Sequence, residues 1–160
     1  IDKSKVVVGG DVNDKTYQIS PTVMDNVLEG DAVMGEEIFG PIMPILTFET
    51  MDEVITTINS HDKPLALYIF SSDKTSIQAV TSRCSYGGGC INDVVIHLAT
   101  PYMGFGGVGE SGMGSYHGKT GFDTFTHYKS IVDKKTWLDL PMRYQPYQKL
   151  YEILLRFFLK

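Results

Sequence analysis

Apolar and polar positions alternate in blocks along the chain and predict strands and helices in turn. Short apolar runs predict strands at residues 5–9, 16–23, 42–49, 65–71, 90–98 and 126–133. Pro21 lies in the second run and has no backbone N–H, so we expect that strand at the edge of a sheet. The run at 65–71 lacks polar alternation, which predicts burial on both of its faces.

Segments with helical spacing separate several of these runs. Residues 51–60 have apolar positions on one face, and Thr50 with Glu53 predicts a capping box at the start of that helix. Residues 73–83 predict a second helix, and residues 147–160 predict a third, amphipathic one. Strands that alternate with helices are parallel and joined by right-handed crossovers, so the predicted fold class is α/β.

The composition is that of an ordinary globular protein. The chain has 160 residues, 42% of them hydrophobic, and a formal net charge of −5. This length fits one domain of about 150 residues, and the balance excludes a disordered chain. No apolar run approaches the roughly 18 residues that a membrane span needs. The acidic balance, without a basic stripe, argues against a nucleic-acid partner.

The cysteines point to neither a disulfide framework nor a zinc site. Cys84 and Cys90 are too few for the first, and their spacing does not fit the second. We therefore expect no metal and a reducing, cytoplasmic compartment. The chain begins with Ile1 rather than Met, and no signal-peptide pattern follows. We expect it to be a piece of a longer protein.

The glycine-rich segment 103–121 has no hydrophobic period, which predicts a long loop with no helix. Its G-x-G-x-x-G pattern therefore lacks the helix that a dinucleotide fingerprint requires. Ser111, His117 and Asp123 match a nucleophilic triad by residue type alone. A lone histidine such as His117 is more often structural than catalytic.

The segment EEIFGP at residues 36–41 allows two interpretations. It can be a solvated acidic turn with Phe39 in the core. Alternatively, a carboxylate of this turn accepts hydrogen bonds from two vicinal hydroxyls, while a neighbouring aromatic ring packs against a flat heterocycle. Those contacts are the ones that hold a nicotinamide riboside.

Several further motifs accompany this hexapeptide. They are KPLALY (63–68), GGG followed by ND (87–93), FGGVGESGMG (105–114), YHGK (116–119) and FDTFTH (122–127). Together the motifs resemble those of NAD(P)-dependent aldehyde dehydrogenases. Their residues are most similar to the class 3 branch, which includes fatty and aromatic aldehyde dehydrogenases. The resemblance covers roughly residues 5–150. It implies part of the catalytic domain of that family, a mostly parallel sheet with crossover helices.

The resemblance also implies roles for individual residues. Glu37 corresponds to the acid that binds the nicotinamide-ribose hydroxyls of NAD or NADP, and Phe39 to the ring beside the nicotinamide. His117 falls where this branch has a histidine close to the active site. The wall of the aldehyde pocket corresponds to Val95, Leu98 and Phe105.

The resemblance implies that the nucleophilic cysteine and the general-base glutamate lie upstream, so we expect no catalytic residue in this chain beyond a role for His117 near the site. Residues 1–125 are then part of the catalytic domain, residues 126–140 an oligomerisation arm that pairs two subunits, and residues 141–160 an amphipathic tail. Basic and apolar residues in the tail allow peripheral membrane contact, or else packing over the substrate entrance or the core. The alternative function is a non-catalytic assembly or dimerisation module derived from the same fold.

Overall fold

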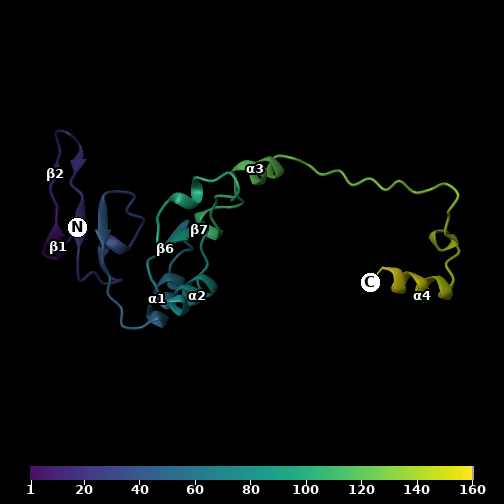
Figure 1. Ribbon diagram of the computed structural model, residues 1–160, viewed down its shortest axis with the longest axis horizontal. Coiled ribbons are helices and arrows are strands. Elements are labelled where there is room, and N and C mark those ends of the chain that lie inside the picture. Colours follow the sequence, from purple (N-terminus) through teal and green to yellow (C-terminus); the bar gives the residue numbers. More distant parts are fainter. Residues whose placement is uncertain (160) are drawn as a thin grey trace. The chain divides into compact units, whose positions relative to one another are not determined.

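The computed structural model describes residues 1–159 (Figure 1). The chain divides into two units, Ile1–Phe125 and a second one that begins at Thr126. Strands and helices alternate through the first unit, which confirms the α/β class. Short 3-10 turns lie at Lys3–Lys5, Ala32–Met34, Ile96–Leu98, Gly109–Ser111 and Pro141–Arg143.

A three-stranded sheet opens the first unit. Its order is β1 (Val6–Val8), β4 (Thr22–Met24) and β5 (Ile42–Pro44). β1 runs antiparallel to β4, and β4 runs parallel to β5. Between β1 and β4 the chain forms a small hairpin of β2 (Val12–Asn13) and β3 (Gln18–Ile19).

The edge strand expected at residues 16–23 is wrong. The segment divides into β3 and β4, and β4 is the central strand of its sheet. Pro21 precedes β4, so its ring removes no donor from the ladder, and Thr22 N donates to Pro41 O at 2.8 Å. The strand expected at 42–49 is shorter than predicted, because β5 ends at Pro44, beside the end of its neighbour β4.

The second sheet is a parallel pair with a helical crossover, as predicted. β6 (Ala66–Ile69) and β7 (Gly88–Ile91) pair in parallel, and α2 (Lys74–Arg83) connects them. α1 (Met51–Ser60) precedes β6, and the two helices lie side by side (Figure 1). They supply the buried side chains Ile55 and Val80, against which β6 packs. All four residues of β6 are only half-buried, so the burial expected on both faces is incomplete within this chain.

The sequence prediction misplaced β7. Two glycines of the turn expected at 87–89 belong to the strand, which ends at Ile91 rather than Leu98. Gly89 lies so close to β6 that an added Cβ would be 1.9 Å from Leu67 O. Asn92 follows the strand with φ 58°, which ends the extended backbone.

Side chains cap α1 and α2. Thr50 Oγ1 accepts a hydrogen bond from Glu53 N at 3.3 Å at the start of α1. The Glu53 carboxylate accepts from Glu49 N at 2.9 Å, one residue earlier than the capping box predicts. At the start of α2, Asp73 accepts from the backbone N–H groups of Thr75 and Ser76.

The glycine-rich segment contains a helix that the sequence did not predict, α3 (Gly118–Thr124). Glycine is a poor helix former, so the glycines of this segment gave no indication of a helix in the sequence. Side-chain contacts one turn apart stabilise it: Lys119 pairs with Asp123, and Thr124 Oγ1 donates to Thr120 O at 2.8 Å.

The second unit contains one α-helix in the part that the structure describes, α4 (Lys149–Phe158). The strand expected at residues 126–133 is wrong for the single chain, where this stretch carries no strand. A strand requires a hydrogen-bonded neighbour, and β-pairing within residues 1–159 involves other segments. Every helix of the described chain is too short or too polar to cross a membrane.

Candidate functional site

A group of aromatic and histidine side chains gathers where β6 and β7 meet the glycine-rich segment. We call it the aromatic–histidine cluster, and its members are Tyr68, His97, Phe105, Tyr116 and His117. Tyr68 comes from β6, and His97 comes from the 3-10 turn that follows β7. The remaining members come from the two sides of the glycine-rich segment.

Backbone pairing holds the two sides of the glycine-rich segment together. Phe105 N donates to Tyr116 O at 2.9 Å, and Tyr116 N donates to Phe105 O at 3.0 Å. The pairing places the His117 ring on the Phe105 ring, with centroids 6.1 Å apart and planes inclined by 19°. His117 has φ 101°, a conformation that L-residues rarely adopt. The structure therefore brings together two residues that the sequence assigned to the site, Phe105 and His117.

The other two residues of the predicted pocket wall are close in the chain to one member of the cluster. Val95 and Leu98 flank His97 in the chain, and the ring of His97 lies 5.6 Å from that of Phe105. Val95 is 52% exposed and has φ 65°. A β-branched residue at positive φ is strained, and such strain is common at functional sites.

The predicted cofactor residues lie in the turn before β5. Glu37 is exposed, and none of the hydrogen bonds among the described residues involves its carboxylate. Phe39 is 95% exposed, with φ 41°. The interpretation of Phe39 as a core residue is therefore wrong. No ring contact or hydrogen bond within residues 1–159 connects this turn with the aromatic–histidine cluster.

The two cysteines have different surroundings. Cys84 is buried at the end of α2, and burial raises the pKa of its thiol, which disfavours the thiolate. Cys90 lies in β7, with Sγ 3.5 Å from Nδ1 of His97. Sequence reasoning missed this contact, because residues 90–98 were predicted to form a single strand.

The triad that residue types allowed is not assembled. Ser111 Oγ donates to Val108 O and accepts from Val108 N, both at 3.0 Å, while Asp123 pairs with Lys119. These hydrogen bonds hold the Ser111 side chain against the backbone of the 3-10 turn Gly109–Ser111. Within residues 1–159, no group of three or more potential metal ligands gathers.

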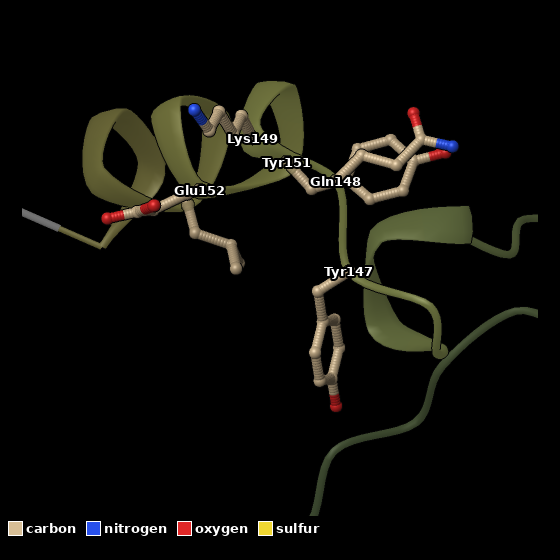
Figure 2. A pocket seen from close by; sticks show the side chains of 6 residues that line it. Tyr147, Gln148, Lys149, Tyr151 and Glu152 are labelled. Carbon is tan, nitrogen blue, oxygen red and sulfur yellow. The ribbon is translucent and has the colours of Figure 1, made fainter.

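The second unit has a surface hollow of about 360 Å³ beside α4. Figure 2 shows that its lining side chains diverge instead of meeting at one point. The lining residues are Tyr147, Gln148, Lys149, Tyr151, Glu152 and Leu155. None of the residues predicted for the cofactor or the aldehyde is among them, so the hollow offers no candidate active site.

Comparison with known proteins gives a consistent result. Residues 2–131 match the family described as "Aldehyde dehydrogenase family". The 4,4'-diaponeurosporen-aldehyde dehydrogenase of Staphylococcus aureus is 48% identical over 153 residues, which cover 96% of this chain and 33% of that protein. The dimeric NADP-preferring aldehyde dehydrogenase of Rattus norvegicus is 46% identical over 134 residues, which cover 84% of this chain and 30% of that protein.

A solved structure shows the same agreement in three dimensions. The substrate-bound state of Staphylococcus aureus AldH superposes with a TM-score of 0.88 at 48% identity, covering 97% of this chain and 34% of that one. The chain thus spans about a third of the length of these relatives.

Proposed function

The chain belongs to the aldehyde dehydrogenase family, and from that premise we propose that it is the C-terminal third of an enzyme that oxidises an aldehyde to a carboxylic acid. In this proposal the nucleophilic cysteine and the general-base glutamate lie upstream. The cysteine adds to the aldehyde carbon as a thiohemiacetal, loss of a hydride to the cofactor leaves a thioester, and water hydrolyses the thioester to the carboxylic acid and the free thiol. We use "longer polypeptide" for the protein that contains this chain together with those upstream segments.

The turn before β5 supports a nicotinamide cofactor, NAD or NADP, which would accept the hydride when bound. Its exposed carboxylate and exposed ring, Glu37 and Phe39, are two residues apart. The Glu37 carboxylate would accept hydrogen bonds from ribose hydroxyls, and the Phe39 ring would pack beside the nicotinamide. This pair is the observation that carries the proposal. The rat relative is named NADP-preferring, which supports the same cofactor class.

The experiment that tests this role compares two adjacent acids in the longer polypeptide. Glu37→Gln should reduce kcat/KM for the cofactor roughly ten-fold, because it weakens charge-assisted hydrogen bonds. Glu36→Gln, an exposed neighbour with the same change in charge, should leave it unchanged. Equal rates for both variants would contradict the assignment of Glu37.

We assign the aldehyde to the apolar surface formed by Val95, Leu98 and Phe105, with His117 beside it. Val95 and Leu98 are 52% and 36% exposed in this chain, and Phe105 is half-buried. An apolar wall of this kind suits a fatty or aromatic aldehyde better than a charged one. Rates that fall as the apolar group of the aldehyde grows would contradict this substrate class.

The segment 126–133 is our candidate for a contact between two subunits. Ile131 and Val132 are 75% and 90% exposed. A strand of a partner subunit would supply the ladder that the single chain lacks. The rat relative is named dimeric, which supports pairing. Val132→Asp should convert the dimer to a monomer in light scattering, whereas Lys134→Asp should not; an unchanged mass for Val132→Asp would contradict this role.

α4 supports a second proposal, contact with an anionic membrane surface. Leu150, Ile153 and Phe157 lie on one face of the helix and are 60%, 64% and 77% exposed, while Lys149 and Arg156 lie along one edge of that face. Flotation with phosphatidylserine vesicles should be lost in Phe157→Ser and kept in Glu152→Gln. Equal flotation of the two variants would instead favour a role of the tail in packing.

The rival function is a non-catalytic assembly module. The intact mass of the natural gene product distinguishes it, because the module would have a mass near 17.8 kDa. A mass about three times larger, with aldehyde-dependent formation of NADH or NADPH, would support the enzyme.

A further inference from the structure

His97 is a buried histidine with 9% of its surface exposed, at the centre of the contacts described above. Its ring lies edge-on to Tyr68, with centroids 5.8 Å apart, and tilted toward Phe105, with centroids 5.6 Å apart. Sequence analysis did not select it, because residues 90–98 were predicted to form a single strand.

Two neighbours fix the ring of His97. Cys90 Sγ lies 3.5 Å from Nδ1 on one side. On the other side Gly88 leaves room for the ring, because an added Cβ would be 3.1 Å from Cδ2. The ring is thus held against Gly88 and Cys90, two alternate positions on one face of β7.

The second nitrogen of the ring plays no part in holding it. Nε2 of His97 is buried and has no hydrogen-bond partner among residues 1–159. An unpaired buried polar atom is unfavourable, so residues held in this way usually have a specific purpose. Of the ring contacts of His97, the one with Phe105 reaches a residue of the proposed aldehyde wall.

Phe105 contacts two imidazole rings. The His97 ring is tilted against it, and the His117 ring stacks on it. Because Phe105 is half-buried while His97 is buried, a change at His97 would reach the pocket surface through Phe105.

We propose that His97 is a positioning residue that sets the orientation of the Phe105 ring, and through it the selectivity for the aldehyde. This inference rests on the proposed function, because Phe105 belongs to the proposed aldehyde wall. Cys90 contacts His97, and His97 contacts Phe105. Of these three residues, only Phe105 belongs to the proposed aldehyde wall.

The test uses the longer polypeptide with 4-fluorophenylalanine at position 105. His97→Asn keeps a polar atom near Cys90 but removes the ring, so the fluorine resonance should shift. The ratio of kcat/KM for a long-chain against a short-chain aldehyde should then change roughly ten-fold, the scale of a small misfit in an apolar pocket. His97→Phe restores a ring and should return both readouts most of the way. Val80→Ala, which makes a cavity in the α1–α2 core, should lower stability without changing either.

Each outcome supports or overturns the proposed role of His97. An unchanged fluorine resonance in His97→Asn would overturn the positioning role, and so would an equal shift in Val80→Ala. A shifted resonance with an unchanged selectivity ratio would overturn the link to the substrate. If the polypeptide oxidises no aldehyde, the proposed function fails, while the fluorine measurement still decides whether His97 orients Phe105.

Discussion

Asn92 and Ser71 join the carboxyl-terminal ends of the parallel strands β6 and β7 through two reciprocal hydrogen bonds. Ser71 N donates to Asn92 Oδ1 at 2.8 Å, and Asn92 Nδ2 donates to Ser71 O at 3.0 Å. Asn92 N also donates to Ile69 O at 2.7 Å. The Asn92 side chain therefore continues the hydrogen bonding between β6 and β7 by one more pair of bonds. The residues Val95 and His97 follow shortly after it in the chain.

Asn92→Ala should destabilise the longer polypeptide by about 2–3 kcal/mol. It removes two hydrogen bonds of about 1 kcal/mol each and places a Cβ without a polar group at φ 58°. Asn92→Gly removes the same bonds but tolerates positive φ, so it should be less destabilising by about 1 kcal/mol. Urea denaturation measures both; equal losses would show that the backbone conformation of Asn92 carries no strain.

Gly89→Ala should destabilise the β6–β7 pair by about 3 kcal/mol, the upper range for overpacking. The new Cβ would lie 1.9 Å from Leu67 O, so the strands would have to separate. Gly30→Ala is the matched control, because nothing lies within 4 Å of its added Cβ. Thermal unfolding should distinguish the two variants, and a Gly89→Ala protein as stable as Gly30→Ala would contradict the observed packing.

Val95→Gly should be better tolerated than Val94→Gly. The two valines are neighbours of similar exposure, 52% and 46%, but only Val95 has positive φ. Replacing Val95 removes a strain of about 1–2 kcal/mol, which offsets the entropy that glycine adds to the unfolded chain. Urea denaturation of both variants checks this difference. If Val95→Gly were the more destabilising change, the strain at Val95 would be absent.

The stabilisation of α2 by Asp73 should depend on pH. The Ser76 hydroxyl, and then the backbone N–H groups of Ser76 and Thr75, donate to its carboxylate and hold its pKa below the ordinary value of 3.8. A carboxylate with a lowered pKa stabilises the folded state fully above pH 3.8, and the effect is lost as the pH falls through the lower, folded-state pKa.

The difference in stability between the parent and Asp73→Asn should therefore be constant at neutral pH and should shrink toward zero at acid pH. Asp62→Asn is a control, because Asp62 makes no hydrogen bond or ion pair among the described residues. Thermal midpoints measured against pH give the comparison. A difference that grew on acidification would reverse the sign of this prediction.

Local signals in the sequence predicted α1 and α2 well. The Thr50 cap and the apolar spacing gave α1 with the bounds observed, and Asp73 marked the start of α2. The parallel pairing of β6 with β7 also followed from the alternation of elements. These features depend on neighbours in the chain, which is why a single sequence contains them.

Features that depend on distant contacts were missed. Gly89 resembles a turn residue in sequence, and only the approach of Leu67 shows why a strand needs it. The central position of β4 depends on β5, which lies beyond a long loop. His97 gained significance only when folding placed it between Cys90 and Phe105.

The candidate site followed a similar division. The resemblance selected Phe105 and His117, and the structure places their rings together. It gave no indication of the strained backbone at Val95 or of the contact between Cys90 and His97.

The β6–α2–β7 crossover has a consequence for the order of folding. Leu67 and Gly89 pair across an intervening stretch that contains α2. The entropy lost in closing a loop rises with its length, and chains fold faster when their contacts are local. We therefore expect α2, whose contacts are local, to form before β6 and β7 pair, and the glycine-rich segment that follows β7 to be arranged later.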